Sequence, residues 1–308
     1  MFVGLAAVSG MTGLPPWTEE WCLAVLGSEP VETLFVVSHL SEVAGVRLAD
    51  GRAVVVKRRA DESGRTRQCV RAQRLLAEAG FPCPMPLTDV ILDSGFAAHA
   101  EEFVAGGEVE TDEGPAAARR SAALLADLVG RLAAIDVEPP LPNPEWVRWE
   151  SLPERQATAA AEAPAWLEDT SRRVRTKLAG CRLPPVLGHV DWEAQNMRWL
   201  RDDPLAVHDW DSLGWLPEAA LVGTAAGVFA SYGEPTLAPV ESSEAFLDAY
   251  ARARGQTVSA YEREVAWAAS ILVALHNARD ELIFNRPKLT YTRLEAQHEE
   301  RLGRANAP

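Results

Sequence analysis

The chain has few cysteines, and none is arranged as in a disulfide scaffold or a zinc site. Its 308 residues hold four, with no CxxC pair and no cluster of histidines beside them: Cys22, Cys69, Cys83 and Cys181. Structural zinc sites and small secreted scaffolds both require cysteines at short, repeated spacings. We therefore expect reduced thiols in a cytoplasmic protein and no structural zinc.

Long apolar runs and an excess of basic charge are also absent from the sequence. No apolar run approaches the ~18 residues that cross a bilayer, and the mildly apolar first residues lack the basic region of a signal peptide. The 30 basic and 44 acidic residues give a formal net charge of −14, which argues against nucleic acid as a partner. We expect neither a membrane nor a nucleic acid as a partner. The acidic balance would attract a cationic small molecule, but solubility explains it equally well.

The predicted elements change in kind along the chain, from strands to helices. Three β-rich segments follow a short helix over residues 17–26, and Asp50-Gly51 between the last two is a strong hairpin signal. A helix over residues 65–79 and a hairpin over residues 90–104 come next. Apolar spacing then predicts further helices over residues 115–135, 153–180, 213–232, 243–254 and 261–284. This order predicts an α+β fold with a small β-rich part and a larger helical part.

Residues 187–213, LGHVDWEAQNMRWLRDDPLAVHDWDSL, concentrate polar side chains between two short apolar runs. The pattern predicts a strand, an exposed loop and a hairpin that turns at residues 201–204, with an acid where the second strand ends. Such a hairpin can bring Asp191 and Asp209 close together. Oxygen ligands such as Asn196 and Asp209 suit Mg²⁺, which keeps several waters and takes other ligands from substrate phosphates.

His189-x-Asp191-x-x-x-x-Asn196 followed by Asp209 resembles a motif of the aminoglycoside phosphotransferase and choline kinase-like small-molecule kinases, relatives of the protein kinases. The usual form in that family is HGD-x-x-x-x-N followed by IDW; here it reads HVD and HDW, and neither change affects a residue with a chemical role. The resemblance implies that Asp191 is the base or orienter of an acceptor hydroxyl and that Asn196 and Asp209 bind Mg²⁺. It also implies that His189 is a structural brace.

The same resemblance implies a bilobal protein-kinase-like fold. Residues 1–104 would form the N-lobe with its nucleotide-binding sheet. Residues 105–308 would form the C-lobe with the catalytic loop, the metal site and the acceptor-binding helices.

Four residues of the predicted N-lobe are candidates for nucleotide contacts. Lys57 ends an apolar strand, as the lysine of the VAIK strand does, and would contact the phosphates. Ser41 lies where a phosphate-covering loop belongs; this loop has no GxGxxG motif, but the hydroxyl could donate to a phosphate oxygen. The segment EEFVAGG resembles the family's hinge, where the main chain of Glu102 and Val104 would hold adenine.

The helix over residues 65–79 departs from the family pattern. Family members have a glutamate here that pairs with the strand lysine, but Gln68 or Cys69 falls near that place. The partner of Lys57 therefore stays open. The role of Asp211 also stays open, between a second metal contact and a helix cap.

These calls predict a Mg²⁺-dependent kinase that moves the γ-phosphate of ATP or GTP to a small-molecule hydroxyl. A cationic acceptor such as an aminoglycoside suits the acidic charge, while an amino sugar or a choline-like alcohol suits the motifs equally well. The missing helix glutamate and glycine loop leave open a catalytically silent nucleotide-binding protein. Two further readings are an acidic loop without chemistry and a transition-metal hydrolase with these ligands: His189, Asp191, His208, Asp209 and Asp211.

Overall fold

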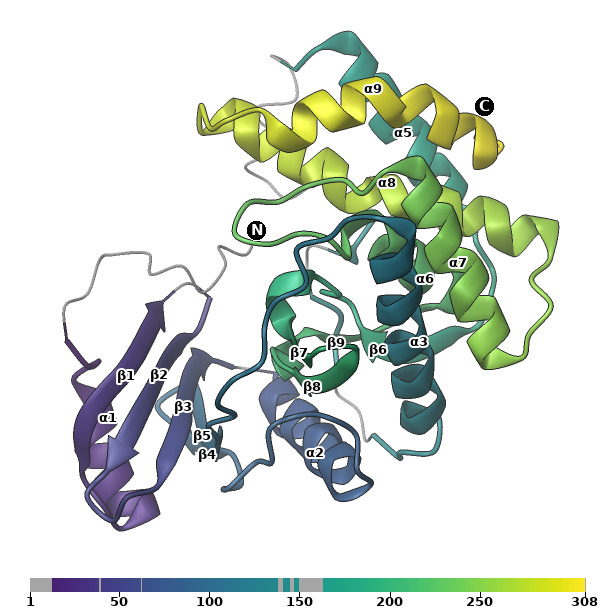
Figure 1. Ribbon diagram of the computed structural model, residues 1–308. Coiled ribbons are helices and arrows are strands. Elements are labelled where there is room, and N and C mark those ends of the chain that lie inside the picture. The colour runs from purple at the N-terminus through teal and green to yellow at the C-terminus, as the bar shows by residue number, and fades with distance from the viewer. Residues whose placement is uncertain are drawn as a thin grey trace.

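The computed structural model describes residues 13–38, 40–61, 63–137, 141–144, 147–149 and 163–307. A β-sheet lies at one end of the molecule and most helices at the other, and the segments with the predicted catalytic residues lie between them (Figure 1). The predicted α+β order of elements is therefore confirmed.

The N-terminal sheet is antiparallel, with β1 (Pro30–Ser38), β2 (Glu42–Leu48), β3 (Ala53–Ala60), β4 (Ile91–Asp93) and β5 (Phe96–Glu102) in the order β1-β2-β3-β5-β4. The first helix, α1 (Trp17–Trp21), continues as a π-helix, η1 (Cys22–Leu26), that packs on one face of the sheet. Val54 and Val56 of β3 are buried in that packing. Because side chains alternate along a strand, Lys57 lies on the opposite face, toward the rest of the molecule.

Helix α2 (Arg65–Glu78) begins where Asp61 accepts hydrogen bonds from the main-chain N–H groups of Arg65 and Thr66. Its buried face joins the main core through residues such as Leu76 rather than the small core of the sheet. A separate small cluster joins its Val70 to Val90 and to Ala97 of β5, so the helix packs against both halves of the molecule. Gly80 follows the helix in the left-handed conformation, which ends it near the predicted position, residue 79.

The predicted catalytic residues lie in the segments that connect four short strands. The strands β6 (Pro185–His189) and β9 (Leu213–Pro217) pair antiparallel, and so do β7 (Met197–Leu200) and β8 (Asp203–Val207). The short helices η4 (Ala194–Asn196) and η5 (Trp210–Ser212) connect them. The predicted strand and hairpin over residues 187–207 are confirmed, but the prediction of an exposed loop between them was wrong: Asp191 and Asn196 are only 6% and 9% exposed, because the loop packs against the main core through residues such as Trp192.

The prediction of a helix over the whole of residues 213–232 was wrong. Residues 213–217 form β9, and the helix α6 (Glu218–Val228) begins only after Pro217. The reason is that a fully buried strand and a buried helix both appear as continuous apolar sequence, and only the pairing with β6 decides between them.

The helical part contains α3 (Pro115–Leu132), α5 (Ala165–Ala179), α7 (Val240–Arg254), α8 (Ala260–Ile283) and α9 (Leu289–Arg304). The predicted helix over residues 153–180 is present from Ala165, and residues 153–162 lie outside the described residues. Helix α9 was not predicted. Within the described parts of the chain, no helix is both long enough and apolar enough to cross a membrane.

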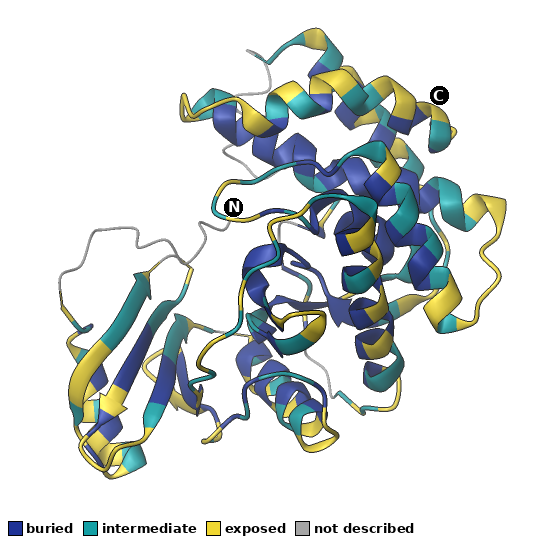
Figure 2. Ribbon diagram, viewed as in Figure 1, coloured by how far each residue is buried: buried dark blue, intermediate teal, exposed yellow. Residues whose placement is uncertain are grey.

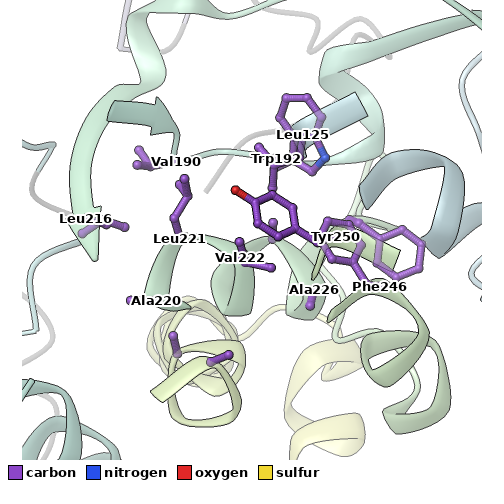
Figure 3. Packing of buried hydrophobic residues seen from close by; sticks show 14 of the residues in the cluster. Leu125, Val190, Trp192, Leu216, Ala220, Leu221, Val222, Ala226, Phe246 and Tyr250 are labelled. Atoms are coloured by element: carbon purple, nitrogen blue, oxygen red, sulfur yellow. The ribbon is translucent and has the colours of Figure 1, made fainter. Parts of the chain in front are cut away.

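Helix α6 is the centre of the larger half. It is buried along nearly its whole length (Figure 2), and its side chains meet those of β9, α3 and α7 in one continuous core (Figure 3). Tyr250 of α7 and Trp192 of the predicted catalytic loop lie in this same core. The loop is therefore anchored to the most buried part of the molecule.

Candidate active site

The predicted catalytic loop follows β6, and two of the predicted site residues touch there. Asp191 is only 6% exposed. The Asn196 side-chain nitrogen donates to Asp191 Oδ2 at 2.8 Å and to the Asp191 main-chain oxygen at 2.9 Å. These two bonds use both hydrogens of the amide. The Asn196 side-chain oxygen is the atom left to bind a cation.

Asp209, the predicted metal acid, lies beside Asn196 at the start of η5. The His208 N–H donates to the Asn196 main-chain oxygen at 2.8 Å, which joins the two segments. Asp209 has φ 60° and ψ 51°, a left-handed conformation that costs a non-glycine residue about 1–3 kcal/mol. Ser212 Oγ donates to Asp209 Oδ2 at 2.7 Å. The turn thus holds one oxygen of this carboxylate in a fixed direction.

His189 lies fully buried beneath both segments. Its Nε2 is 3.0 Å from the His208 main-chain oxygen. Its ring meets Trp192 and Trp210 edge to face, with ring centroids 5.7 Å and 6.0 Å away. Burial lowers the pKa of His189, which favours the neutral form. These contacts agree with a structural brace.

The loop gathers negative charge in a buried place. Burial, with the negative charge of Asp209 adding to it, raises the pKa of Asp191 to about 7. Burial and the charge of Asp191 raise the pKa of Glu193 well above its usual range, and Gln195 Nε2 donates to Glu193 Oε2 at 2.6 Å. Sequence analysis did not single out Glu193. Clustered carboxylates with raised pKa values indicate a negative local potential, which favours the binding of a cation.

Lys57 has a carboxylate partner that sequence analysis missed. Lys57 Nζ lies 2.8 Å from Glu101 Oε1 of the neighbouring strand β5. Helix α2, where the partner was sought, contributes Gln73 instead, whose Nε2 donates to Glu101 Oε2 at 2.9 Å. The partner of Lys57, which the sequence left open, is therefore a residue of the sheet, and the α2 residue that reaches this pair is Gln73 rather than Gln68 or Cys69. Glu101 had been noted only as part of the hinge-like segment.

Asp211 joins the two halves of the molecule. Its Oδ2 lies 2.9 Å from Arg59 Nη1 of β3 and 3.4 Å from the Ser41 hydroxyl, which donates to it. Arg59 and Lys57 are two apart on one strand, so both face Asp211 and Asp209. The structure thus places Ser41 beside Asp211, two residues after the predicted metal acid Asp209, and it shows that Asp211 binds the sheet rather than only capping a helix.

The hinge-like segment follows β5. Glu102 N–H already donates to the Met85 main-chain oxygen at 2.9 Å. Within the described residues, no main-chain hydrogen bond engages Val104. The Glu102 N–H is therefore already used within the protein, whereas the main-chain groups of Val104 are available to a ligand.

The transition-metal reading gains no support from the geometry. Among the residues that the structure describes, no group of three or more His, Cys, Asp or Glu side chains is arranged to hold a metal ion. An oxygen site built from Asn196 and Asp209 is a different case, because two protein ligands suffice when waters and phosphates supply the rest.

A model of the phosphotransferase enzyme family matches residues 41–267, which include Lys57 and the whole predicted catalytic stretch. The chain belongs to this family. As a member it is a small-molecule kinase, and the predicted resemblance to aminoglycoside phosphotransferases and choline kinase-like enzymes is confirmed. No curated protein matches the chain.

Solved structures confirm the predicted bilobal, protein-kinase-like fold. An amicoumacin kinase in complex with AMP-PNP, Ca²⁺ and its ligand superposes with a TM-score of 0.65 at 14% identity, covering 91% of this chain and 90% of that one. A spectinomycin phosphotransferase in complex with ADP and spectinomycin has a TM-score of 0.58 at 12% identity, with coverage of 96% and 94%. A choline/ethanolamine kinase family protein from Mesorhizobium loti has a TM-score of 0.53 at 17% identity, with coverage of 90% and 87%. At these identities the likeness concerns the fold.

Proposed function

We propose that this family member transfers the γ-phosphoryl group of ATP or GTP to a hydroxyl of a small molecule in a Mg²⁺-dependent reaction. The observation that carries the proposal is the bonded pair of Asp191 and Asn196 beside Asp209, with Lys57 facing the same space. A proton acceptor, two oxygen ligands and a cation for phosphate are what phosphoryl transfer requires.

The donor atoms fit a magnesium ion. Asn196 presents its amide oxygen because its nitrogen is used, and Asp209 presents one carboxylate oxygen because Ser212 holds the other. Hard oxygen donors on two short turns suit Mg²⁺. When bound, Mg²⁺ would supply positive charge that offsets the negative charge of the nucleotide phosphates. The fold neighbour that binds AMP-PNP with Ca²⁺ supports a divalent cation at such a site.

The nucleotide would lie between the proposed N-lobe, residues 1–104, and the proposed C-lobe, residues 105–308. Lys57 would neutralise phosphate charge, Ser41 would donate to a phosphate oxygen, and the main chain near Glu102 and Val104 would hold adenine. Ser41 donates to Asp211 in the described structure, so nucleotide binding would exchange this partner for a phosphate.

Asp191 would orient the acceptor hydroxyl and accept its proton. Asn196 holds Oδ2 of this carboxylate, which leaves Oδ1 to face the hydroxyl. The buried position keeps water away from the transferring group and strengthens the electrostatic interactions there.

We propose a hydroxylated, cationic acceptor, because the chain is acidic and buried carboxylates surround Asp191. The neighbours are described with amicoumacin, spectinomycin or hygromycin B, or as choline/ethanolamine kinase family members. An antibiotic of the aminoglycoside kind and a smaller amino alcohol therefore remain the two acceptor classes to test. One ground for a catalytically silent protein is removed, because Lys57 has a carboxylate partner in Glu101.

The test is transfer of phosphate to a panel of acceptors. Purified protein is incubated with Mg²⁺, ATP or GTP, and aminoglycosides, amino sugars, choline-like alcohols or neutral polyols, and new phosphomonoesters are detected by ³¹P NMR. The proposal predicts an O-phosphorylated product from at least one amine-bearing acceptor. Nucleotide binding without transfer to any of them would favour the silent alternative.

Asp191→Ala is the matched variant for this assay. We expect it to lower kcat by about 10²- to 10⁴-fold, the range for loss of a general base, and to leave nucleotide binding largely intact. Markedly weaker nucleotide binding by the variant would contradict the role assigned to Asp191.

A further inference from the structure

We infer that Glu101 of β5 is the positioning residue for Lys57, a role that the family's lysine–glutamate pairing assigns to the helix. The inference rests on the proposed function, because it concerns how Lys57 is presented to the nucleotide phosphates. It adds two residues to the site, Glu101 and Gln73, that neither motif nor spacing identified.

Strand pairing places Glu101 where it can act. The register sets Lys57 opposite His99 and Val55 opposite Glu101, so Lys57 and Glu101 lie on one face of two adjacent strands and are diagonal neighbours. Diagonal pairs on one face are within reach of long side chains. The lysine Nζ and the glutamate Oε1 meet at 2.8 Å, and their side chains are 12% and 2% exposed.

Helix α2 supports this arrangement with an amide. The fully buried Gln73 donates from the same nitrogen to Glu101 Oε2 at 2.9 Å and to the Pro84 main-chain oxygen at 2.8 Å. Both partners are acceptors. A glutamate at position 73 would face an acceptor oxygen on each side and would have no hydrogen to donate. Since the helix provides a donor here, the carboxylate that pairs with Lys57 comes from the sheet.

The charges around Lys57 explain what Glu101 does for it. Burial alone would lower the pKa of Lys57, but Glu101, followed by Asp211 and Asp209, outweighs burial and raises it. Asp211 is already paired with Arg59, whereas Asp209 is the proposed metal ligand. Without Glu101, the remaining carboxylate that attracts the lysine is that of Asp209, which Mg²⁺ needs. Glu101 thus holds Lys57 near the phosphate position and away from Asp209.

The Lys57–Glu101 ion pair does not depend on the position of helix α2. Lys57 and its partner lie in one sheet and stay together if α2 shifts, so the lysine is positioned by the sheet itself. A buried ion pair of this kind is strongly disrupted when one partner is removed.

The test is a double-mutant cycle read out by calorimetric binding of two probes, MgATP and adenosine. We expect Glu101→Gln to weaken MgATP binding about tenfold or more, as loss of a charged hydrogen bond does, and to leave adenosine binding unchanged because adenosine has no phosphate. In a Lys57→Met background, adding Glu101→Gln should cause no further loss, because Glu101 acts through the lysine. Glu101→Asp keeps the charge but shortens the side chain, so it should give a smaller loss of MgATP affinity. If Glu101→Gln does not fold, Glu101→Asp is the variant that tests the inference.

Glu32→Gln is the control, because it makes the same change in an exposed ion pair of the same sheet, with Arg47 at 2.9 Å; it should bind both probes as wild type does. Three results would overturn the inference alone. Glu101→Gln could bind MgATP normally or more tightly, it could lose adenosine binding to the same extent as MgATP binding, or it could cause the same loss of MgATP binding in the Lys57→Met background. Wild type that does not bind MgATP would overturn the proposed function and this inference with it.

Discussion

Asp191 has the proton-accepting role in the proposed reaction, and its surroundings make that role sensitive to pH. Burial and the charge of Asp209 raise its pKa to about 7, and only the ionised carboxylate can accept a proton. We therefore expect kcat/KM to fall as the pH decreases through this value and to level off above it. Mg²⁺ bound at Asp209 would offset the negative charge that helps to raise this pKa. The midpoint of the pH–rate profile should therefore move to lower pH as the Mg²⁺ concentration increases.

The measurement is a pair of pH–rate profiles at low and high Mg²⁺ concentration. A rate that does not fall on the acidic side, or a midpoint that moves upward with Mg²⁺, would show that Asp191 does not titrate in the assigned role.

At the scale of single residues, the sequence motif predicted the site residues that share one loop. It missed the contacts whose partners come from a separate strand. The Asp191–Asn196 contact spans one short loop, so the motif spacing nearly determines it. The pairs Lys57–Glu101 and Arg59–Asp211 instead depend on strand register and on how the sheet faces the helical part. No local spacing encodes either of these.

At the scale of elements, Arg65 ties helix α2 to the catalytic segments. Its guanidinium donates to the main-chain oxygens of Asp211, at 2.8 Å, and of Pro142 and Leu213. Arg65→Ala leaves these acceptors without a partner, and hydrogen bonds of charged groups contribute about 1.5–3 kcal/mol each. We expect a loss of about 2–4 kcal/mol in the free energy of unfolding, measured in urea. The exposed Arg67 of the same helix is the control, since Arg67→Ala should change stability by less than about 0.5 kcal/mol.

The contact between α6 and α8 depends on two glycines. A Cβ at Gly223 would lie 2.1 Å from the Ala266 main-chain oxygen, and one at Gly227 would lie 2.2 Å from that of Ser270. Gly223→Ala should therefore lower the midpoint of thermal unfolding, because overpacking costs about 1–3 kcal/mol or more. Gly303→Ala in α9, where no atom lies within 4 Å of the new Cβ, should be neutral or raise stability by up to about 1 kcal/mol. Equal midpoints for the two variants would contradict the packing described.

Most elements could be predicted from sequence, with two informative failures. Residues 213–217 form a strand because β6 pairs with them, and the apolar sequence alone does not record that pairing. Helix α9 was missed although its polar face and buried Leu294 and Leu302 have helical spacing. Its position depends on contacts with α8 and α5, which are tertiary.

At the scale of the whole molecule, the proposed reaction requires both halves to meet at one site. Lys57 and Arg59 come from β3 and Ser41 from the connection of β1 to β2, whereas Asp209 and Asp211 come from the connection of β8 to β9. The order of strands and helices predicted this division, but not the ion pair that joins the halves. The acceptor is not determined by either half alone, because charge and fold suit several hydroxylated amines.

The most direct test of the central claim is calorimetric binding of ATP and GTP, with and without Mg²⁺, to wild type, Asp209→Ala and Asp203→Ala. Asp203 is an exposed acid at the start of β8, the strand that precedes Asp209, and serves as the control. We predict Mg²⁺-dependent binding of at least one nucleotide by wild type and Asp203→Ala, and its loss in Asp209→Ala. Absence of binding to either nucleotide, or unchanged Mg²⁺-dependent binding by Asp209→Ala, would contradict the account.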